Sequence, residues 1–249
     1  MKKTEKFSRS ECIEKSSLTQ SRSKNKEISS RVKEQAQKVS ERLRELYPDA
    51  PCALEYGGEP WKLMVMGRLS AQCTDKRVNE VCASLFERFP TPDALAYADI
   101  ADIEQIVRPC GLFHVKSSDI KGECMMLVEK YGGVLPDTME ALLEFPGVGR
   151  KIANLLLGDI YKKGGIVADT HCIRICGRLG FYTEGEKSPL VCERTMSELI
   201  DREEQSDFCH RIVMFGREFC RAASPECNIC PLCDLCNADA KRKKAEKIK

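Results

Sequence analysis

The stretch Phe145-Pro146-Gly147-Val148-Gly149-Arg150-Lys151 lies between two segments with helical periodicity, about 137–145 and 150–162. Its two glycines allow the backbone to turn tightly and to approach a ligand without interference from a Cβ atom. The turn would leave unpaired N–H groups at the positive end of the second helix, which is a favourable seat for a phosphate group. Such a hairpin can hold a nucleic-acid backbone without reading bases. The alternative is a plain helical hairpin with a glycine cap.

Lys151 falls in the first turn of the second predicted helix. The positive end of a helix disfavours an ammonium ion, and the neighbouring charge of Arg150 does the same. Partial burial would add to both effects, so the position favours a neutral, nucleophilic amine. The alternatives are a lysine that binds phosphate electrostatically and a lysine that is simply exposed. Position alone does not decide among them.

Asp169 precedes the next predicted helix, about 170–178, after a glycine pair at 164–165. A carboxylate at this position is a good N-cap. It could also lie near the lysine, where it would assist deprotonation and stabilise positive charge that develops on a sugar. The two roles are compatible, because an N-cap carboxylate is held rigidly.

Two further turns follow apolar segments. The first, Leu69-Ser70-Ala71-Gln72-Cys73-Thr74-Asp75, is polar, and the second, Gly111-Leu112-Phe113, carries an apolar pair that we expect to be exposed. Taken alone, both are ordinary loop and core residues. Proteins that flip a base out of DNA need side chains that fill the vacated stack. The amide of Gln72 and the side chain of Leu112 suit that task.

Helical periodicity extends over most of the remaining chain. Ile28, Val32, Val39, Leu43 and Leu46 follow three- and four-residue steps, which predicts an amphipathic helix that ends before Pro48. Thr91-Pro92 is typical of a helix start, with a capping hydroxyl and a proline in the first turn. Further helical patterns cover 61–71, 78–89, 99–109, 115–131, 188–200 and 206–219. Because no alternating run with hairpin turns is present, the sequence predicts an all-α protein.

Cysteines crowd the C-terminal region and are the strongest single signal. Cys220, Cys227, Cys230, Cys233 and Cys236 lie close together, and two prolines among them forbid a continuous helix. Such a loop can wrap thiolates around a compact metal centre. Zinc is the alternative, although its sites usually show two cysteine pairs separated by a longer gap. The last four cysteines are evenly spaced and could form a ligand set without Cys220. The remaining cysteines are scattered and are expected to be small buried hydrophobic residues.

The net charge of +2 conceals an uneven distribution. Lys and Arg outnumber Asp and Glu by 13 to 8 in residues 1–49 and by 6 to 1 in residues 241–249. Basic ends attract phosphates, although solvated, disordered tails are an equal alternative. Residues 1–27 are polar and predicted to be disordered, with no secretory signal. No apolar run approaches membrane-spanning length. We therefore expect a cytoplasmic protein, where clustered cysteines more often hold metal than form disulfides.

Together these motifs resemble the endonuclease III family. The resemblance rests on Leu-Ser-Ala-Gln-x-Thr-Asp at 69–75, Gly-Leu-Phe at 111–113, Pro-Gly-Val-Gly-Arg-Lys at 146–151, Asp-Thr-His at 169–171 and Cys-x6-Cys-x2-Cys-x5-Cys from 220 to 236. It covers about Val32 to Cys236. The resemblance implies a two-lobed, all-α helix-hairpin-helix DNA glycosylase fold. A six-helix barrel would span 54–163, a helical iron–sulfur cluster domain would combine 28–53 with 164–236, and 237–249 would be a basic tail.

The resemblance also implies a function and a set of site residues. The protein would be a base-excision-repair DNA glycosylase that removes damaged, oxidised pyrimidines, with an associated lyase activity at abasic sites. It would act as a monomer on double-stranded DNA that carries a damaged base or an abasic site. The implied nucleophile is Lys151, with Asp169 as its acidic partner. The implied DNA contacts are Gln72, Leu112, Gly147, Gly149, Arg150 and His171. The implied ligands of a four-iron, four-sulfur (4Fe-4S) cluster are Cys220, Cys227, Cys230 and Cys236, which leaves Cys233 spare.

Two other functions remain open at this stage. A monofunctional glycosylase for mismatched or alkylated bases is one, and Lys151 argues against it. A non-catalytic iron–sulfur DNA-binding module is the other, and the pairing of Lys151 with Asp169 argues against it. The sequence also departs from the family pattern at Phe215, where a His is frequent, and at Gly67-Arg68, where a more apolar helix is usual. The loop that follows Cys220 has Arg221 as its one basic residue.

Overall fold

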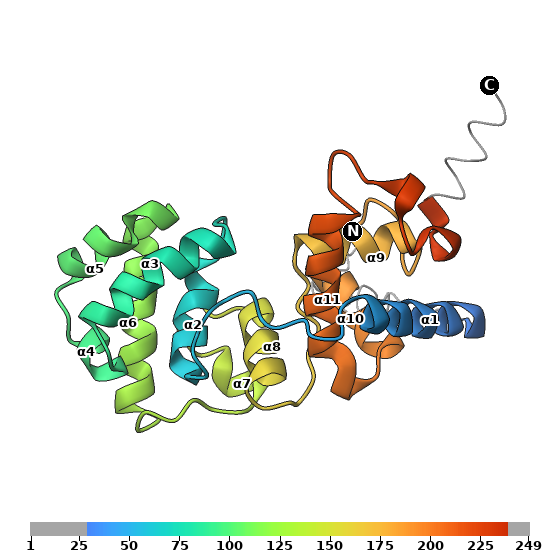
Figure 1. Ribbon diagram of the computed structural model, residues 1–249. Helices are drawn as coiled ribbons and strands as arrows, with labels where there is room; N and C mark the ends of the chain where they lie inside the picture. Colours follow the sequence, from blue (N-terminus) through green and yellow to red (C-terminus); the bar gives the residue numbers. More distant parts are fainter. Residues whose placement is uncertain (1–28, 239–249) are drawn as a thin grey trace, which may run out of the picture.

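The computed structural model describes residues 29–238, so the predicted disordered segment 1–27 and residues 239–249 of the predicted basic tail 237–249 lie outside it. Over the described residues the chain forms helices, turns and loops and no strand, which confirms the all-α prediction. Figure 1 shows two lobes side by side, connected by extended segments. Within the described range, no helix is long and apolar enough to cross a membrane.

One lobe, here called the barrel lobe, contains helices α2 to α8. These are α2 (Pro60–Leu69), α3 (Asp75–Arg88), α4 (Pro92–Ala96), α5 (Ile100–Val107), α6 (Phe113–Glu129), α7 (Met139–Leu142) and α8 (Arg150–Asp159). Its apolar core includes the fully buried side chains of Leu63, Leu85, Ile103, Leu127 and Leu156. Most of α2 is buried, because α3, α6 and α8 all pack against it.

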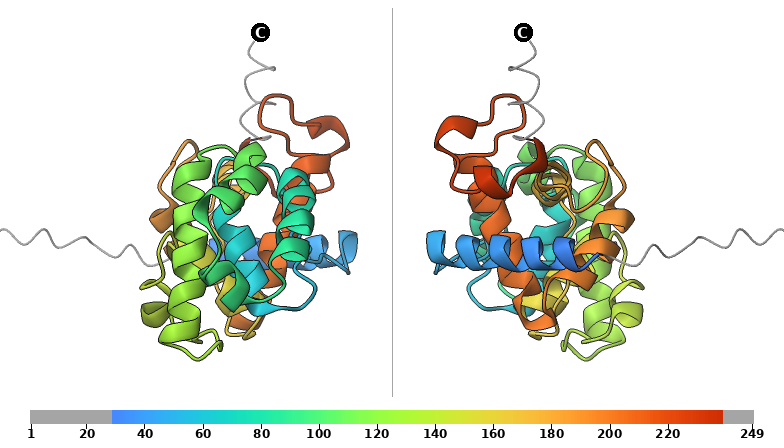
Figure 2. Two further views of the ribbon diagram at one scale, coloured as in Figure 1. Left: turned by 90° about the vertical axis from the view of Figure 1, so that its left-hand side faces the viewer. Right: turned by 90° about the vertical axis from the view of Figure 1, so that its right-hand side faces the viewer.

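The second lobe combines the two ends of the described chain. Its helices are α1 (Ser30–Leu46), α9 (Thr170–Leu179), α10 (Pro189–Leu199) and α11 (Gln205–Glu218). Helix α1 lies against α10 and α11, as the side view in Figure 2 shows. A separate apolar cluster that includes Val39, Leu43, Phe208 and Ile212 fills this lobe. The chain therefore passes between the lobes twice, through residues 47–59 and 160–169.

Most helix boundaries follow local rules. The hydroxyl of Thr91 accepts a hydrogen bond from the Ala94 N–H at 3.1 Å, which confirms the predicted start of α4. The helix predicted over 137–145 is shorter, since α7 covers Met139–Leu142. Proline disfavours helical conformation in the residue before it, and the buried ring of Phe145 anchors the chain just ahead of Pro146.

Packing explains both departures from the family pattern. A Cβ atom at Gly67 would lie 3.1 Å from Cγ2 of Ile152, so the glycine lets α2 approach α8 closely. Arg68 donates to the Asp119 carboxylate at 2.6 Å and lies against Gly147. Phe215 is a core residue of the second lobe, and its ring packs against Phe219. Gly67 and Arg68 therefore belong to the packing beside the hairpin, and Phe215 belongs to the core of the second lobe.

Candidate active-site cleft

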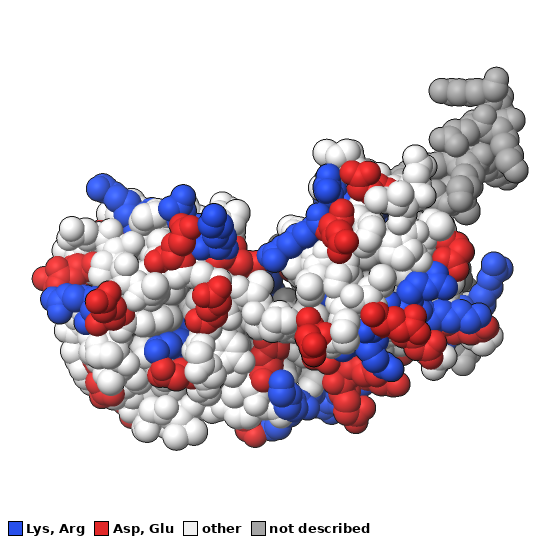
Figure 3. All heavy atoms as spheres, in the orientation of Figure 1, with Lys and Arg blue, Asp and Glu red and all other residues white. Residues whose placement is uncertain are grey.

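A cleft of about 1550 Å³ separates the two lobes and is lined by both of them. Four predicted site residues line it: Gln72 and Lys151 from the barrel lobe, and Asp169 and His171 from the second lobe. Figure 3 shows a hollow between the lobes with Lys and Arg side chains along both sides of its rim. Leu112, Gly147, Gly149 and Arg150 are not among the lining residues.

The hairpin before α8 has the free N–H groups that the sequence predicts. Gly149 is the N-cap of α8, and the N–H groups of Gly149, Arg150 and Lys151 have no acceptor within residues 29–238. A Cβ atom at Gly149 would meet nothing within 4 Å, so space is open beside the helix start. Gly147 differs, because its φ is +71° and an added Cβ would lie 2.5 Å from Nε of Arg68. The fold itself thus requires Gly147, whereas Gly149 leaves room for a ligand.

Lys151 projects from the first turn of α8 and is exposed, so the partial burial considered above is not found. Its amine has no hydrogen-bond or ion-pair partner among the described residues. The charge of the neighbouring Arg150 is offset by Glu193 of α10, with Nε of Arg150 3.0 Å from Oε2 of Glu193. Burial alone would raise the pKa of Glu193, but the hydrogen bonds from Arg150 and Asn154 and the charge of Arg150 together outweigh it and lower that pKa. Arg150 therefore bridges the lobes.

Asp169 is the N-cap of α9, and its Oδ1 accepts a hydrogen bond from the Cys172 N–H at 2.7 Å. The N-cap prediction is confirmed, and the same carboxylate lines the cleft that Lys151 lines. Its position on the second lobe comes from the crossing segment 160–169. The structure thus brings the amine and the carboxylate to one cleft from opposite lobes.

His171 lies in the first turn of the same helix and is half-buried. Burial lowers the pKa of its imidazole, and Arg174 and Arg217 add to this effect against the opposing charges of Asp169 and Asp75. A Cβ atom at Gly216 would lie 2.4 Å from Nδ1 of His171, so the glycine makes room for the ring. The cleft therefore presents a neutral imidazole at neutral pH.

Gln72 and Leu112 share an unusual backbone conformation. Their φ angles are 54° and 48°, and Lys162 is the one other non-glycine residue with positive φ among residues 29–238. Such left-handed conformations are strained for residues with side chains and tend to persist at functional sites. Gln72 faces the cleft, and Leu112 has 60% of its surface exposed, as the sequence predicts. The expectation of exposure is wrong for Phe113, which is half-buried against the core of the barrel lobe.

One residue that the sequence analysis did not identify connects these two loops. Lys116, in the first turns of α6, is fully buried, and its Nζ donates to the carbonyls of Leu69 at 2.8 Å, Ala71 at 2.7 Å and Cys110 at 2.8 Å. Burial lowers the pKa of this lysine. The ammonium has three donors, and each has a partner. A signal was available, since Lys116 shares the buried face of α6 with Ile120 and Leu127.

The C-terminal thiols surround a separate small space in the second lobe. All five cysteines from Cys220 to Cys236 line a cavity of about 30 Å³. Arg178 donates to Sγ of Cys220 at 3.3 Å and to the carbonyls of Arg221 and Ala222 at 2.8 Å. Burial, with a smaller contribution from the neighbouring thiols, raises the pKa of the Cys230 thiol to about 11. A bound cationic centre would offset the negative charges of these grouped thiolates and hold them together.

The spacing of these thiols bears on which centre fits. Within the described residues, no three of the C-terminal thiols lie within 4.8 Å of one another, although three potential ligand atoms elsewhere in the structure do so. They are therefore spread more widely than ligands of a single ion. This spread suits a cluster of several metal atoms better than one zinc ion.

The expectation for the other cysteines is correct for most of them. Seven of the described cysteines outside the C-terminal loop are buried: Cys82, Cys110, Cys124, Cys172, Cys176, Cys192 and Cys209. Cys52 and Cys73 are only half-buried and line the cleft, so for these two the expectation is wrong. Each packs against the core of the barrel lobe on one side and faces the cleft on the other.

Comparison with known proteins agrees with this geometry. Residues 65–202 match the family described as HhH-GPD superfamily base excision DNA repair protein. The chain is 40% identical over 205 residues to endonuclease III of Synechocystis sp., which covers 82% of this chain and 92% of that protein. The chain belongs to the endonuclease III family. Endonuclease III of Bacillus subtilis is 35% identical over 209 residues, covering 84% of this chain and 94% of the relative.

A solved structure shows the same fold within this family. The structure of a non-covalent endonuclease III–DNA complex matches with a TM-score of 0.79 and 38% identity, over 85% of this chain and 98% of that one. The two-lobed helical arrangement is thus the family's fold. The chain is a base-excision DNA repair enzyme, as the family membership shows.

Proposed function

We propose that this chain is a DNA glycosylase that excises oxidised pyrimidines and then cleaves the strand at the abasic site. The observation that carries the proposal is the meeting of Lys151 and Asp169 at one cleft. Each stands at the N-terminal end of a helix, one from each lobe. The lesion class follows from the resemblance to endonuclease III.

The proposed reaction begins with the Lys151 amine in its neutral form. Nζ attacks C1′ of a flipped nucleotide, the bond between C1′ and the base breaks, and the base leaves with the bonding electrons and takes up a proton. The Asp169 carboxylate stabilises the positive charge that develops on the sugar. Loss of a proton from nitrogen and opening of the sugar ring produce a Schiff base. Removal of a C2′ proton then expels the 3′ phosphate, which nicks the strand 3′ to the abasic site.

The proposed DNA contacts use the remaining cleft features. A backbone phosphate would accept hydrogen bonds from the free N–H groups of Gly149, Arg150 and Lys151. Gln72, held in its strained loop, would fill the space of the flipped nucleotide. The exposed side chain of Leu112 would wedge into the opposite strand. His171 and Arg150 would contact the backbone, the latter after exchanging its pairing with Glu193.

We propose that Cys220, Cys227, Cys230 and Cys236 hold a 4Fe-4S cluster, with Cys233 spare. The wide spread of the thiols and the Arg178 hydrogen bond to Cys220 support this assignment. The cluster would stabilise the loop that follows α11. Iron and sulfide analysis of Cys220→Ser and Cys233→Ser variants tests it. Loss of iron in the first variant and retention in the second is the expected result, and the reverse would reject this ligand set.

Borohydride trapping on abasic duplex DNA tests the nucleophile. Reduction of the Schiff base should join the wild-type chain covalently to DNA, and Lys151→Ala should give no adduct while still binding the duplex. Lys76, another lysine of the cleft wall, provides a matched control, since Lys76→Ala should still form the adduct. An adduct that persists in Lys151→Ala would reject the proposal. A panel of oxidised, deaminated, alkylated and mismatched bases tests the lesion class.

A further inference from the structure

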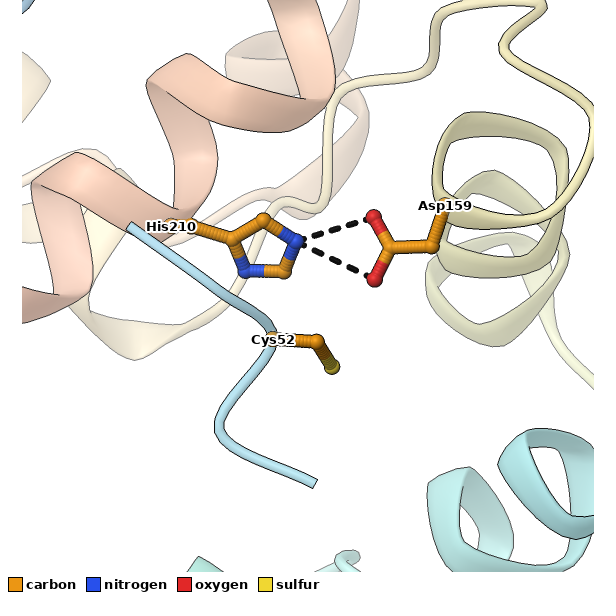
Figure 4. Close-up of side chains that lie close together, drawn as sticks. All are labelled: Cys52, Asp159 and His210. Carbon is orange, nitrogen blue, oxygen red and sulfur yellow. Dashed lines mark hydrogen bonds and ion pairs between the residues drawn. The ribbon is translucent and has the colours of Figure 1, made fainter. Parts of the chain in front are cut away.

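Three side chains with metal-binding atoms converge at the junction of the lobes (Figure 4). Cys52 belongs to the segment between α1 and α2, Asp159 is the last residue of α8, and His210 lies in α11. One ligand atom from each lies within 4.8 Å of the other two, a grouping found nowhere else in residues 29–238. The excision reaction proposed above uses none of these three residues.

We propose that Cys52, Asp159 and His210 bind a zinc ion. Thiolate, carboxylate and imidazole are the three ligand types that zinc prefers, and three protein ligands leave the fourth tetrahedral position for water. Cys52 and His210 line the cleft, so that fourth position has access to solvent. The thiolate and the carboxylate together carry two negative charges, which a divalent ion offsets.

The carboxylate of Asp159 is already oriented for this role. Its Oδ1 accepts a hydrogen bond from the hydroxyl of Ser206, and Nε2 of His210 lies 2.9 Å from Oδ1 and 3.1 Å from Oδ2. Burial works to raise the pKa of this carboxyl, but the interactions with His210, Ser206 and Cys52 together outweigh it and lower the pKa. A buried carboxylate thus stays ionised. A Cβ atom at Gly158 would lie 2.9 Å from Cβ of Ser206, so the glycine makes room for the orienting serine.

The thiol of Cys52 would exchange its proton for the ion. Burial raises its pKa to about 12, and the charge of Asp159 adds to the effect. Without an ion, the thiol keeps its proton beside the carboxylate, and zinc binding releases that proton. Because the ligands come from the crossing segment and from a helix of each lobe, the bound ion would connect both lobes at the wall of the cleft.

Zinc binding to the full chain, purified with its iron, tests the proposal by equilibrium dialysis and elemental analysis. We expect one zinc per chain with no loss of iron and no comparable binding of magnesium, which prefers oxygen ligands. Cys52→Ser and His210→Ala should abolish stoichiometric binding. Ser206→Ala, which removes the orienting hydrogen bond, should weaken it by about tenfold or more. Cys73→Ser, a half-buried cysteine of the same cleft, should bind zinc as the wild type does.

A second measurement uses the wild-type chain and does not depend on variants that fold. Zinc should slow alkylation of Cys52 by a small thiol reagent, followed by peptide mass spectrometry, and leave alkylation of Cys73 unchanged. Absence of stoichiometric zinc, zinc taken up only as iron is lost, or zinc retained in both ligand variants would overturn the proposal. Each of these results would leave the three residues as a hydrogen-bonded triad and would not bear on Lys151.

Discussion

Helices α6 and α8 both begin after a glycine-containing turn, and both carry a lysine near their start, yet the two lysines have opposite environments. Lys116 of α6 is fully buried, with three backbone carbonyls around its amine. Lys151 of α8 is exposed in the cleft and has no partner among the described residues. The comparison shows that an ammonium group whose three N–H donors all have acceptors stabilises the structure, whereas an ammonium group without a partner is available for chemistry.

Replacing Lys151 should give the largest effect and should fall on activity alone. Lys151→Met removes the proposed nucleophile, so strand cleavage should fall by about a thousandfold or more. The side chain makes no hydrogen bond within the described residues, so the free energy of unfolding should barely change. Single-turnover cleavage of abasic DNA and urea denaturation measure the two quantities. If the activity of Lys151→Met were within tenfold of wild type, Lys151 would be an ordinary surface lysine, and the proposed contrast with Lys116 would be wrong.

Substitutions of Asp169 should separate its two roles, which are to cap α9 and to act as the acidic partner of Lys151. Asn caps a helix about as well as Asp, so Asp169→Asn should keep the stability of α9 while base excision slows by about a hundredfold to ten-thousandfold. Asp169→Ala should lose activity and in addition about 1 kcal/mol of stability, since the bond to the Cys172 N–H disappears. Equal activity in Asp169→Asn and the wild type would reduce Asp169 to an N-cap.

Replacing Lys116 should reverse the pattern seen for Lys151. Lys116→Met leaves three carbonyls without their donor, which should cost about 2–4 kcal/mol of stability. Activity at low temperature should fall less than in Lys151→Met, through the loosened loops of Gln72 and Leu112. Lys121→Met offers a control on the same helix, because Lys121 donates to a single carbonyl, that of Ala98. A loss no larger than in this control would show that Lys116 does not hold the loops.

Glu123 lies on the same buried face of α6 as Lys116 and provides a contrast to it. Both of its carboxyl oxygens are buried without a partner, and burial raises its pKa well above the ordinary value of 4.5. The folded protein therefore keeps this proton at a pH where the unfolded chain has lost it, so wild-type stability falls as the pH rises above 4.5. Glu123→Gln should be more stable than wild type at pH 7.

The expected advantage of Glu123→Gln has a definite pH dependence. It should grow as the pH rises above 4.5 and disappear below it, where the carboxyl is protonated in both states. Thermal denaturation at several pH values measures the difference. Glu87→Gln, at an exposed position of α3, should show no such trend. A constant difference between Glu123→Gln and wild type would mean that Glu123 is ionised in the fold.

Local chemistry predicted a large part of this molecule. Apolar periodicity located the helices, Thr91 and Asp169 marked helix starts, and the glycines at 147 and 149 marked the hairpin. The prediction failed for the length of α7, because the contact of Phe145 with the core competes with helix propensity. It also failed for Cys52 and Cys73, since burial depends on which segments cover a residue and not on residue type.

The sequence alone thus determined which residues cap, turn and repeat, because those preferences act over about four neighbouring positions. Only the tertiary structure decided which of these residues lie close together in space. Asp169 faces the cleft of Lys151, Lys116 reaches carbonyls 45 and 47 residues away, and Cys52 lies beside Asp159 and His210. Such contacts depend on how two apolar cores pack across two chain crossings, and no local preference encodes that arrangement.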